Sequence, residues 1–347
     1  MSKDTPTSSR QRFSMAAVRQ LITKNAIALV LLVLVLAIGI IRPSFLGGGN
    51  LLDILRVSSV RLLIALGVTG ILITGGTDLS AGRTVGLACV IAASLAQRPD
   101  YASKIFPNLP QLSIIIPILA AMAAGCLVGF MNGLIVAFLN VPAFIATLGT
   151  MIIVYGAASL YVDHPPLGAA PIGGLKDSFT NLGSGTIGFG HFSIPIIIVI
   201  AFGAFLIYSF LLNRTTLGKN IYAIGGNANA ATVSGVNVRK NLVIIYTIAG
   251  VLYGLAGVLL SARTGGATNE YASGYELDAI AAAVIGGVSI TGGVGTATNA
   301  VIGVLIFEVL NNGLVVLGVS AYWQLVIKGV IIVSAVALDI RKYTRKR

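Results

Sequence analysis

The sequence predicts an all-α integral membrane protein with about ten transmembrane helices. Only 10% of its 347 residues are charged and 56% are hydrophobic, whereas a soluble domain carries about 25% charged residues. The hydrophobic residues gather in runs long enough to cross the hydrocarbon of a bilayer, which takes about 20 residues in a helix. One long polar stretch between two of these runs indicates contact with a soluble partner.

Ten apolar runs give the predicted spans. In chain order they cover residues 25–41, 62–75, 84–96, 112–139, 143–162, 194–212, 242–261, 277–290, 296–318 and 320–338. The runs 84–96 and 277–290 are short for a full crossing, so we expect broken or re-entrant helices there. The first run follows a basic tail, as in a signal peptide. However, bulky Ile40 and Ile41 stand where a cleavage site needs small residues, so this run is kept as a span.

The Lys and Arg residues divide unevenly between the two sides of these spans. With the N-terminus inside, the inner segments hold fifteen of them and the outer segments hold seven. Positive residues favour the cytoplasmic side. This predicts a cytoplasmic tail at residues 1–24, a polytopic transmembrane domain at 25–338 and a basic cytoplasmic tail at 339–347. Because the basic residues bracket spans and form no groove, the net charge of +12 does not indicate binding of nucleic acid. The apolar spans make membrane lipid an expected partner.

Two features within and between the spans predict tertiary structure. Gly125, Gly129 and Gly133 recur every four residues, as do Gly250 and Gly254. Such steps let helix backbones approach each other closely in lipid. The outer loop 163–193 is long enough to form a small structured cap.

Residues 213–240 form the long polar stretch, which we call the polar insert. It is rich in Gly, Ala and Asn, and basic residues flank it. The charge count places it in the cytoplasm. A chain that is otherwise apolar and keeps such a stretch is expected to present it to a soluble protein.

Enzymatic signatures are missing from the sequence. The segment most similar to a phosphate-binding loop, residues 217–220, has Asn220 where Ser or Thr would hold magnesium. His164 and His191 lie in an outer loop without clustered Cys or carboxylate residues, so no metal site is expected. We therefore predict no catalytic residue and no cofactor bound by this chain.

Polar residues in a break between two runs are candidates for a translocation path. Asp78 and Ser80 follow Gly75 and Gly76 in such a break, and transporters often break helices near the route of the substrate. Asp78 equally fits a simpler role as the N-cap of the helix expected from Thr84.

Charged residues in or beside the later runs are further candidates, because an unpaired charge in hydrocarbon is costly and usually faces protein or water. Glu276 and Asp278 open the run at residue 277, and Glu308 and Lys328 lie inside the last two runs. Glu308 and Lys328 could form a structural ion pair, and a role of these residues in transport is an equal alternative. Carboxylates at this depth also leave a proton-coupled secondary transporter as an alternative.

Three separated motifs carry a family resemblance. Residues 215–227 read TTLGKNIYAIGGN, residues 76–83 read GTDLSAGR, and residues 275–295 begin with YELDAIAA and end with GGVG. Together, and in this order, they resemble the sugar-importing ABC permeases of the ribose/xylose/galactoside family. The second motif departs from the pattern of that family at Thr77 and Ala81. This variant is most similar to the permeases of galactose/methyl-galactoside importers.

The resemblance implies that the polar insert holds a helix that couples the chain to an ATPase. The matching positions are Gly218, Gly225, Gly226, Asn227, Asn229, Ala230, Ala231 and Gly235. Small residues would let a short helix seat closely in a cleft of the ATPase, and a Gly can end the helix. Asn229 stands where the wider permease group has Glu, so ion pairing is not expected to be the main contact.

The resemblance also implies an ABC importer permease fold in the bacterial inner (plasma) membrane. Two copies of the chain would form the pore, and a partner ATPase would use ATP and magnesium. A soluble sugar-binding protein would deliver galactose or a methyl galactoside. A ribose- or xylose-type permease is the alternative within this class.

Overall fold

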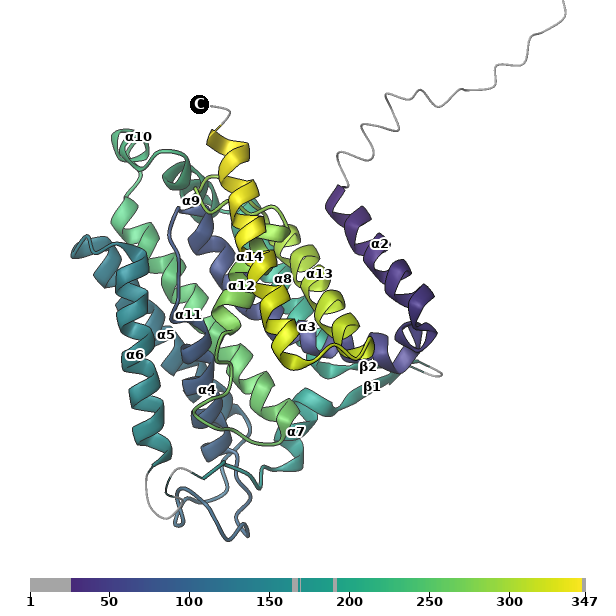
Figure 1. Cartoon of the computed structure of the whole chain (residues 1–347). Helices are drawn as coiled ribbons and strands as arrows, with labels where there is room; N and C mark the ends of the chain where they lie inside the picture. Colours follow the sequence, from purple (N-terminus) through teal and green to yellow (C-terminus); the bar gives the residue numbers. More distant parts are fainter. Residues whose placement is uncertain (1–25, 164–167, 169, 190–191, 345–347) are drawn as a thin grey trace, which may run out of the picture.

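The computed structural model describes residues 26–163, 168, 170–189 and 192–344, and this part of the chain is mainly helical (Figure 1). The predicted tail 1–24 lies outside the described residues. The elements are, in order, α2 (Ala26–Ile41), the 3-10 helix η1 (Pro43–Leu46), α3 (Gly48–Ile73), α4 (Ala81–Leu95), α5 (Ile115–Phe138), α6 (Ala143–Val162), α7 (Asp177–Ser184), β1 (Thr186–Phe189), β2 (Phe192–Pro195), α8 (Ile196–Arg214), α9 (Thr216–Gly226), α10 (Ala228–Val233), α11 (Val238–Thr264), α12 (Tyr275–Ile285), α13 (Ala297–Val316) and α14 (Ala321–Thr344).

Each predicted run corresponds to one helix, which confirms the all-α membrane fold with about ten transmembrane helices. Among the described residues, six helices are long and apolar enough to cross a membrane, namely α5, α6, α8, α11, α13 and α14. The apolar helices α2 and α4 are shorter, and α12 has only 11 residues. α4 and α12 are the two short runs of the sequence, and they begin at buried Ala81 and beside buried Glu276.

Two helices begin earlier than the predicted apolar runs because their first turns contain charged residues. α3 begins at Gly48 and not at residue 62, so Arg56 and Arg61 belong to the helix and not to an outer loop. α4 begins at Ala81, which places Arg83 in its first turn. Moving Arg83 out of the inner count, and Arg56 and Arg61 out of the outer count, leaves fourteen inner against five outer basic residues. The charge bias therefore keeps its sign.

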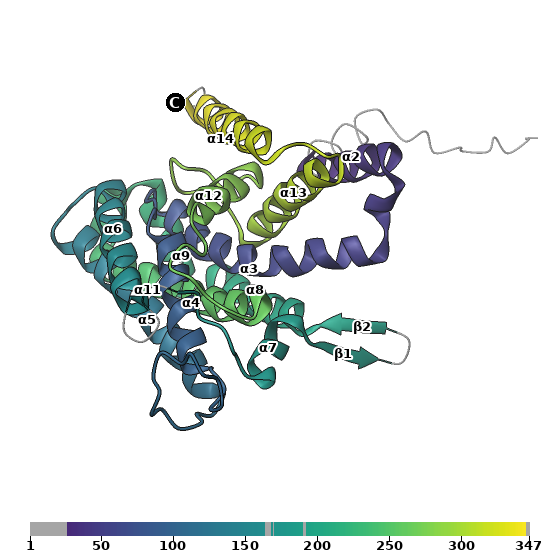
Figure 2. The ribbon, with the colours of Figure 1, turned by 60° about the horizontal axis from the view of Figure 1, so that its bottom comes forward.

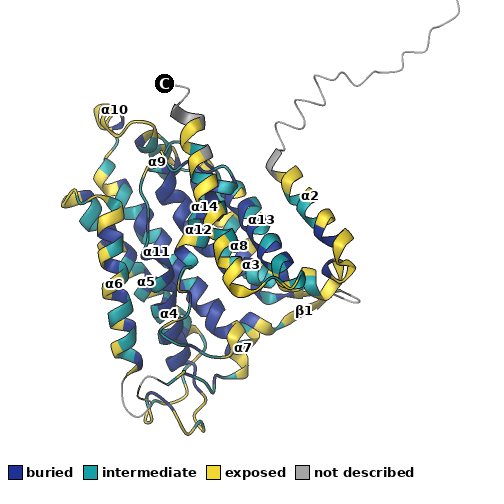
Figure 3. Ribbon diagram, in the orientation of Figure 1, coloured by how far each residue is buried: buried dark blue, intermediate teal, exposed yellow. Residues whose placement is uncertain are grey.

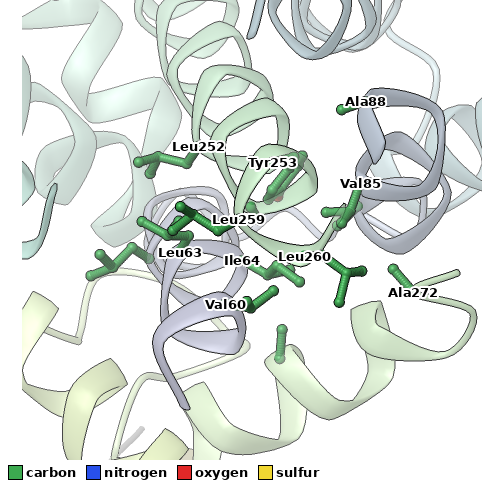
Figure 4. Packing of buried hydrophobic residues seen from close by; sticks show 14 of the residues in the cluster. Val60, Leu63, Ile64, Val85, Ala88, Leu252, Tyr253, Leu259, Leu260 and Ala272 are labelled. Atoms are coloured by element: carbon green, nitrogen blue, oxygen red, sulfur yellow. The ribbon is translucent and has the colours of Figure 1, made fainter. Parts of the chain in front are cut away.

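The helix α11 forms the centre of the bundle. It packs against α3, α4 and α5, and it is buried over most of its length, whereas α14 is largely exposed (Figure 3). Figure 4 shows Tyr253 and Leu259 of α11 packed among residues of α3 and α4, including Leu63 and Val85. The segments around α11 are thereby held as one apolar core.

The glycine steps bring α5 and α11 into backbone contact. A Cβ added at Gly125 would meet the carbonyl oxygen of Gly250, and one added at Gly129 would meet the backbone of Tyr246 and Gly250. Only glycine leaves room for this approach. The prediction of a close helix pair from these residues is confirmed.

The two ends of the bundle carry different elements (Figure 1). The first turns of α2, both helices of the polar insert and the last turns of α14 lie at one end, which we call the α9 end. At the other end lie α7 and the loop that follows α4. α14 continues to Thr344, so the predicted C-terminal tail 339–347 is helical in its first part.

The predicted cap at residues 163–193 is structured over much of its length. It contains α7 and strand β1, and β1 pairs antiparallel with β2 in the register Thr186 opposite Pro195 and Phe189 opposite Phe192. Figure 2 shows this hairpin projecting from the side of the bundle. The hairpin is a small exception to the predicted all-α class.

Candidate functional site

The polar insert folds into two short helices, α9 and α10, between the membrane helices α8 and α11. At the starts of α9, α10 and α11, a side-chain oxygen accepts a hydrogen bond from a backbone N–H. Such caps stabilise helix starts. The pairs are Thr215 with Gly218 at 3.3 Å, Asn227 with Ala230 at 2.9 Å, and Asn237 with Lys240 at 2.9 Å. Three helix starts are thus encoded within the insert itself.

The helix α10 ends at Val233, and Gly235, two residues later, closes it as expected from the sequence. Gly235 has a φ of +85°, which L side chains rarely adopt. Its N–H donates to the carbonyl of Thr232, and the N–H of Val236 donates to that of Ala231, both over 3.0 Å. This pair of bonds is the Schellman arrangement that closes many helices.

Most of the α10 surface is open to solvent. Val233 is 90% exposed, and Asn229 and Ala230 are exposed as well. Ala231 is instead only 4% exposed and packs within its own chain. A bulky residue at Ala231 would therefore disturb the insert itself, which corrects the expectation that Ala231 belongs to the surface that a partner meets.

The helix α9 rests on the end of α3 and on the loop between α12 and α13. A Cβ at Gly225 would overlap the carbonyl oxygen of Ile73, the last residue of α3. The hydroxyl of Tyr222 donates to the carbonyl of Gly295 over 2.7 Å. Partial burial raises the pKa of Tyr222 above its ordinary value, which keeps this donor protonated at neutral pH. α9 thus links exposed α10 to the helix break that follows α3.

The exposed helix α14 is tied to the same loop by one side chain. Asp339 accepts hydrogen bonds from the hydroxyl of Ser289 and from the backbone N–H of Ile290, both over 3.0 Å. The sequence had placed Asp339 in the C-terminal tail, so this contact was not foreseen. A single carboxylate among the basic residues of that tail was the available signal.

Residues 74–80, which we call the break segment, connect α3 to α4 and carry Asp78 and Ser80. Asp78 is buried, and its Oδ1 accepts from the backbone N–H of Ser80 at 2.9 Å and from its hydroxyl at 2.6 Å. The side chain of Asn132 on α5 donates to the Ser80 hydroxyl over 2.8 Å. Asp78 therefore holds a turn before Ser80, the residue that precedes α4, and the expected N-cap of a helix starting at Thr84 is wrong.

An open cavity of about 300 Å³ lies beside the break segment. Thr74, Gly75 and Gly76 form one wall, and the turn between α5 and α6 with Asn140 forms another. Tyr246 completes the lining, and its hydroxyl donates to the carbonyl of Thr77 over 3.3 Å. The break segment is thus accessible from the cavity as well as held by α11.

Glu276 and Asp278, both in the first turn of α12, contact different neighbours. Glu276 is buried against α4, where a Cβ at Gly82 would meet its carboxylate. Asp278 faces Arg61 of α3 at 3.7 Å and Lys328 of α14 at 3.5 Å. The structure therefore brings Glu276 to the start of α4, close in sequence to Asp78 and Ser80, and places Asp278 in a separate cluster.

The separate cluster, which we call the charge cluster, consists of Arg61, Asp278, Glu308 and Lys328. Arg61 forms an ion pair with Glu308 of α13 and lies over the ring of Tyr275 at 5.0 Å. The pairing expected between Glu308 and Lys328 is replaced by Arg61 with Glu308 and Lys328 with Asp278. Opposite charges offset each other here, as intramembrane charges require. The sequence missed Arg61 because its helix was predicted to start later.

A metal centre is not visible among the described residues, where no group of three or more His, Cys, Asp or Glu side chains comes together. His164 and His191 lie outside the described residues. The arrangement that the structure does provide is mechanical: exposed α10, then α9, then the end of α3 with the break segment. Such a chain of contacts can pass a displacement from the surface to residues deep in the bundle.

Comparisons with known proteins show which family the chain resembles. A family described as "Branched-chain amino acid transport system / permease component" matches residues 50–336. The galactose/methyl galactoside import permease protein MglC of Escherichia coli K12 is 52% identical over 93% of this chain and 96% of its own length. That of Haemophilus influenzae is 51% identical over 94% of this chain and 97% of its own length. The ribose import permease protein RbsC of Bacillus subtilis is 40% identical over 90% of this chain and 91% of its own length.

No solved structure matches the chain. The family match nevertheless covers well over half of the residues, and it includes the break segment, the polar insert and the charge cluster. The chain is a multi-pass membrane protein that belongs to this family of transport-system permease components.

Proposed function

We propose that the chain is the transmembrane permease subunit of an ATP-driven, binding-protein-dependent sugar importer for galactose and methyl galactosides. The identity of 52% over 93% of the chain to the Escherichia coli galactose/methyl galactoside permease carries this proposal. The ribose permeases of Bacillus subtilis and Escherichia coli, at 40% and 38%, support the alternative substrate less well. No residue of this chain is assigned a catalytic role.

The partners follow from the same proposal. An ATPase subunit binds the exposed face of α10 and uses ATP and magnesium, while this chain binds neither. A second copy of the chain completes the pore, and a soluble sugar-binding protein delivers the sugar from outside. The protein resides in the inner membrane with both termini and the polar insert in the cytoplasm. The fourteen-to-five bias of basic residues supports this orientation, as does the position of the first turns of α2 and the last turns of α14 at the α9 end.

The contacts of the polar insert suggest how ATP drives transport. Closure of the ATPase displaces α10, and α9 follows because the two helices are joined by the single residue Asn227. α9 presses on Ile73 through Gly225 and thereby moves the break segment with Asp78 and Ser80. Asp78 and Ser80 precede α4 and Glu276 lies in the first turn of α12, so these candidate path residues lie at the starts of the two short helices that this movement reorients. Asp278 instead anchors α12 to α3 and α14.

Reconstitution tests the proposal directly. The chain is expressed with a candidate ATPase and a candidate sugar-binding protein in proteoliposomes, and uptake of labelled galactose, methyl galactoside, ribose and xylose is measured with and without ATP. We expect ATP-dependent uptake of the first two sugars. Uptake of ribose or xylose alone would show that the permease belongs to a pentose importer. Uptake driven by a proton gradient without ATP would overturn the proposal.

A further inference from the structure

An ion pair on the surface of the bundle is not explained by the packing of the helices. Arg83 of α4 donates to the carboxylate of Glu270 over 3.3 Å, and its guanidinium lies 4.1 Å from the ring centre of Tyr155. The hydroxyl of Tyr155, on α6, donates to the other carboxylate oxygen of Glu270. We call Arg83, Tyr155 and Glu270 the triad; Glu270 is exposed, whereas Arg83 and Tyr155 are half-buried.

The triad lies at the depth of the hydrocarbon. Tyr155 is twelve residues from the start of the 20-residue α6, which is about 18 Å along the helix. α6 is one of the helices long and apolar enough to cross a membrane. The side chain of Glu270 is nevertheless 58% exposed. A charged group cannot face lipid at this depth at a low cost, so the triad faces water or a polar ligand.

Other residues of α6 show what a lipid-facing surface of this helix looks like. Ile153 is 70% exposed and Leu160 is 77% exposed, and both are apolar. Because successive residues of a helix point about 100° apart, Ile153 and Tyr155 lie on opposite sides of α6. Ile152, which is 64% exposed, lies only about 60° from Tyr155 around the helix. The polar surface of α6 is therefore a narrow strip that holds Tyr155 and, one turn later, Ser159, whose hydroxyl accepts a hydrogen bond from Asn269.

The triad also holds unused hydrogen-bonding capacity. Arg83 has five N–H donors, and within the described chain only its Nη1 is engaged, by Glu270 and by the carbonyl of Asn269. The Glu270 carboxylate keeps free lone pairs. Glu276, beside Gly82, adds a buried carboxylate oxygen that no donor in the described chain meets. A pyranose has an apolar C–H face and a rim of hydroxyl groups. The ring of Tyr155 can contact the C–H face, and the guanidinium and carboxylates beside it can form hydrogen bonds with the hydroxyl groups.

We propose that Arg83, Tyr155 and Glu270 contact the sugar in the translocation path, with a hexopyranose as the ligand. The inference rests on the proposed function, since it names the part of the permease that meets the transported sugar. In the absence of a sugar, Arg83 and Glu270 satisfy each other. When a sugar passes, its hydroxyl groups bind the free donors of Arg83 and the lone pairs of Glu270.

A merely structural role for the triad predicts different behaviour. The ion pair would then serve only to join α4 to the segment before α12, and reversing both charges would preserve that link. A sugar contact does not survive reversal, because the positions of donors and acceptors toward the ligand are exchanged. The test therefore uses Arg83→Gln, Glu270→Gln and the double reversal Arg83→Glu with Glu270→Arg.

Each variant is reconstituted with the ATPase and the sugar-binding protein, and two rates are measured: galactose uptake and the ATP hydrolysis that the sugar-loaded binding protein stimulates. We expect uptake to fall about tenfold or more in each single variant, the effect of losing a charge-assisted hydrogen bond, while stimulated hydrolysis stays within twofold. The double reversal should stay as low as the single variants. Tyr161→Phe, which removes a hydroxyl from the same helix away from the triad, should transport normally.

The outcomes separate this inference from the proposed function. If wild type neither transports galactose nor stimulates hydrolysis, the proposed function fails. If wild type works and the single variants match it, or if the double reversal restores uptake, the sugar contact is overturned.

If a single variant loses both galactose uptake and stimulated ATP hydrolysis, the solvent accessibility of position 155 decides between the two roles. In a background with Cys89 and Cys126 replaced by Ala, Tyr155→Cys should react with a charged thiol reagent during turnover and Ile153→Cys should not. An unreactive Tyr155→Cys contradicts a path at this surface.

Discussion

The backbone N–H of Gly293 donates to the carbonyl oxygen of Ile73 over 2.8 Å, which joins the loop between α12 and α13 to the last residue of α3. Gly225 of α9 packs against the same carbonyl. Three segments that are far apart in the sequence therefore meet at one backbone group. The break segment starts at the next residue, so a displacement of α9 reaches it without an intermediate.

The first prediction concerns this contact. Gly225→Ala places a methyl group on the Ile73 carbonyl and pushes α9 away from α3. We expect transport and stimulated ATP hydrolysis to fall at least tenfold. Gly226→Ala is the matched control, because a Cβ there meets nothing within 4 Å, and it should be active. Ala is favoured over Gly inside a helix by up to about 1 kcal/mol, so a loss at Gly225 alone cannot come from helix propensity. Equal activity of the two variants would remove α9 from the coupling route.

The second prediction concerns the charge cluster. Glu308→Ala leaves Arg61 without its closest partner in a buried setting, where the side chain of Glu308 is 5% exposed. Removing one member of a buried pair costs about 3–5 kcal/mol, so the variant should unfold in detergent at a clearly lower temperature. Asp53→Ala breaks the pair of Asp53 with Arg56, in which Asp53 is 61% exposed. That loss should be below about 1 kcal/mol. Similar melting temperatures of the two variants would argue against a stabilising role of the cluster.

The third prediction concerns orientation. Val233 lies at the α9 end and Ser178 lies on α7 at the other end, and both are exposed. In a background without Cys89 and Cys126, Ser178→Cys should react with an impermeant thiol reagent added to right-side-out vesicles. Val233→Cys should react only in inside-out vesicles. The reverse labelling pattern would mean that the permease has the opposite orientation in the membrane, and it would contradict the prediction from the basic residues.

Local features of the sequence predicted the fold well where a single segment determines the outcome. Apolar runs gave the ten helices, and Gly235 gave the end of α10, because both depend on residues near in the chain. The start of α3 was misplaced because Arg56 and Arg61 break the apolar pattern, although Arg61 is neutralised by Glu308, 247 residues away. A charge inside a helix can be assigned only when its partner is known.

The candidate site was predictable only in part, for the same physical reason. The motifs located the polar insert and the break segment, yet no local pattern shows that Gly225 rests on Ile73. The sequence also could not tell that Ala231 faces its own chain while Ala230 faces outward. Capping residues fix the ends of α10, whereas its rotation depends on tertiary packing against α9 and α11.

The rotation of α10 gives the fourth prediction, which separates docking from folding of the insert. Ala230→Trp adds a large side chain on the exposed face of α10, so the insert keeps its structure but no longer fits a cleft of the ATPase. Ala231→Trp forces the same side chain into a buried site and displaces α10 from α9. We expect both variants to insert in the membrane and to lose transport. Only Ala231→Trp should make the insert more sensitive to a protease added at the cytoplasmic face. Ala230→Trp should instead resist the protease as wild type does and fail to copurify with the ATPase. If Ala230→Trp binds the ATPase and transports at the wild-type rate, the exposed face of α10 is not the docking surface.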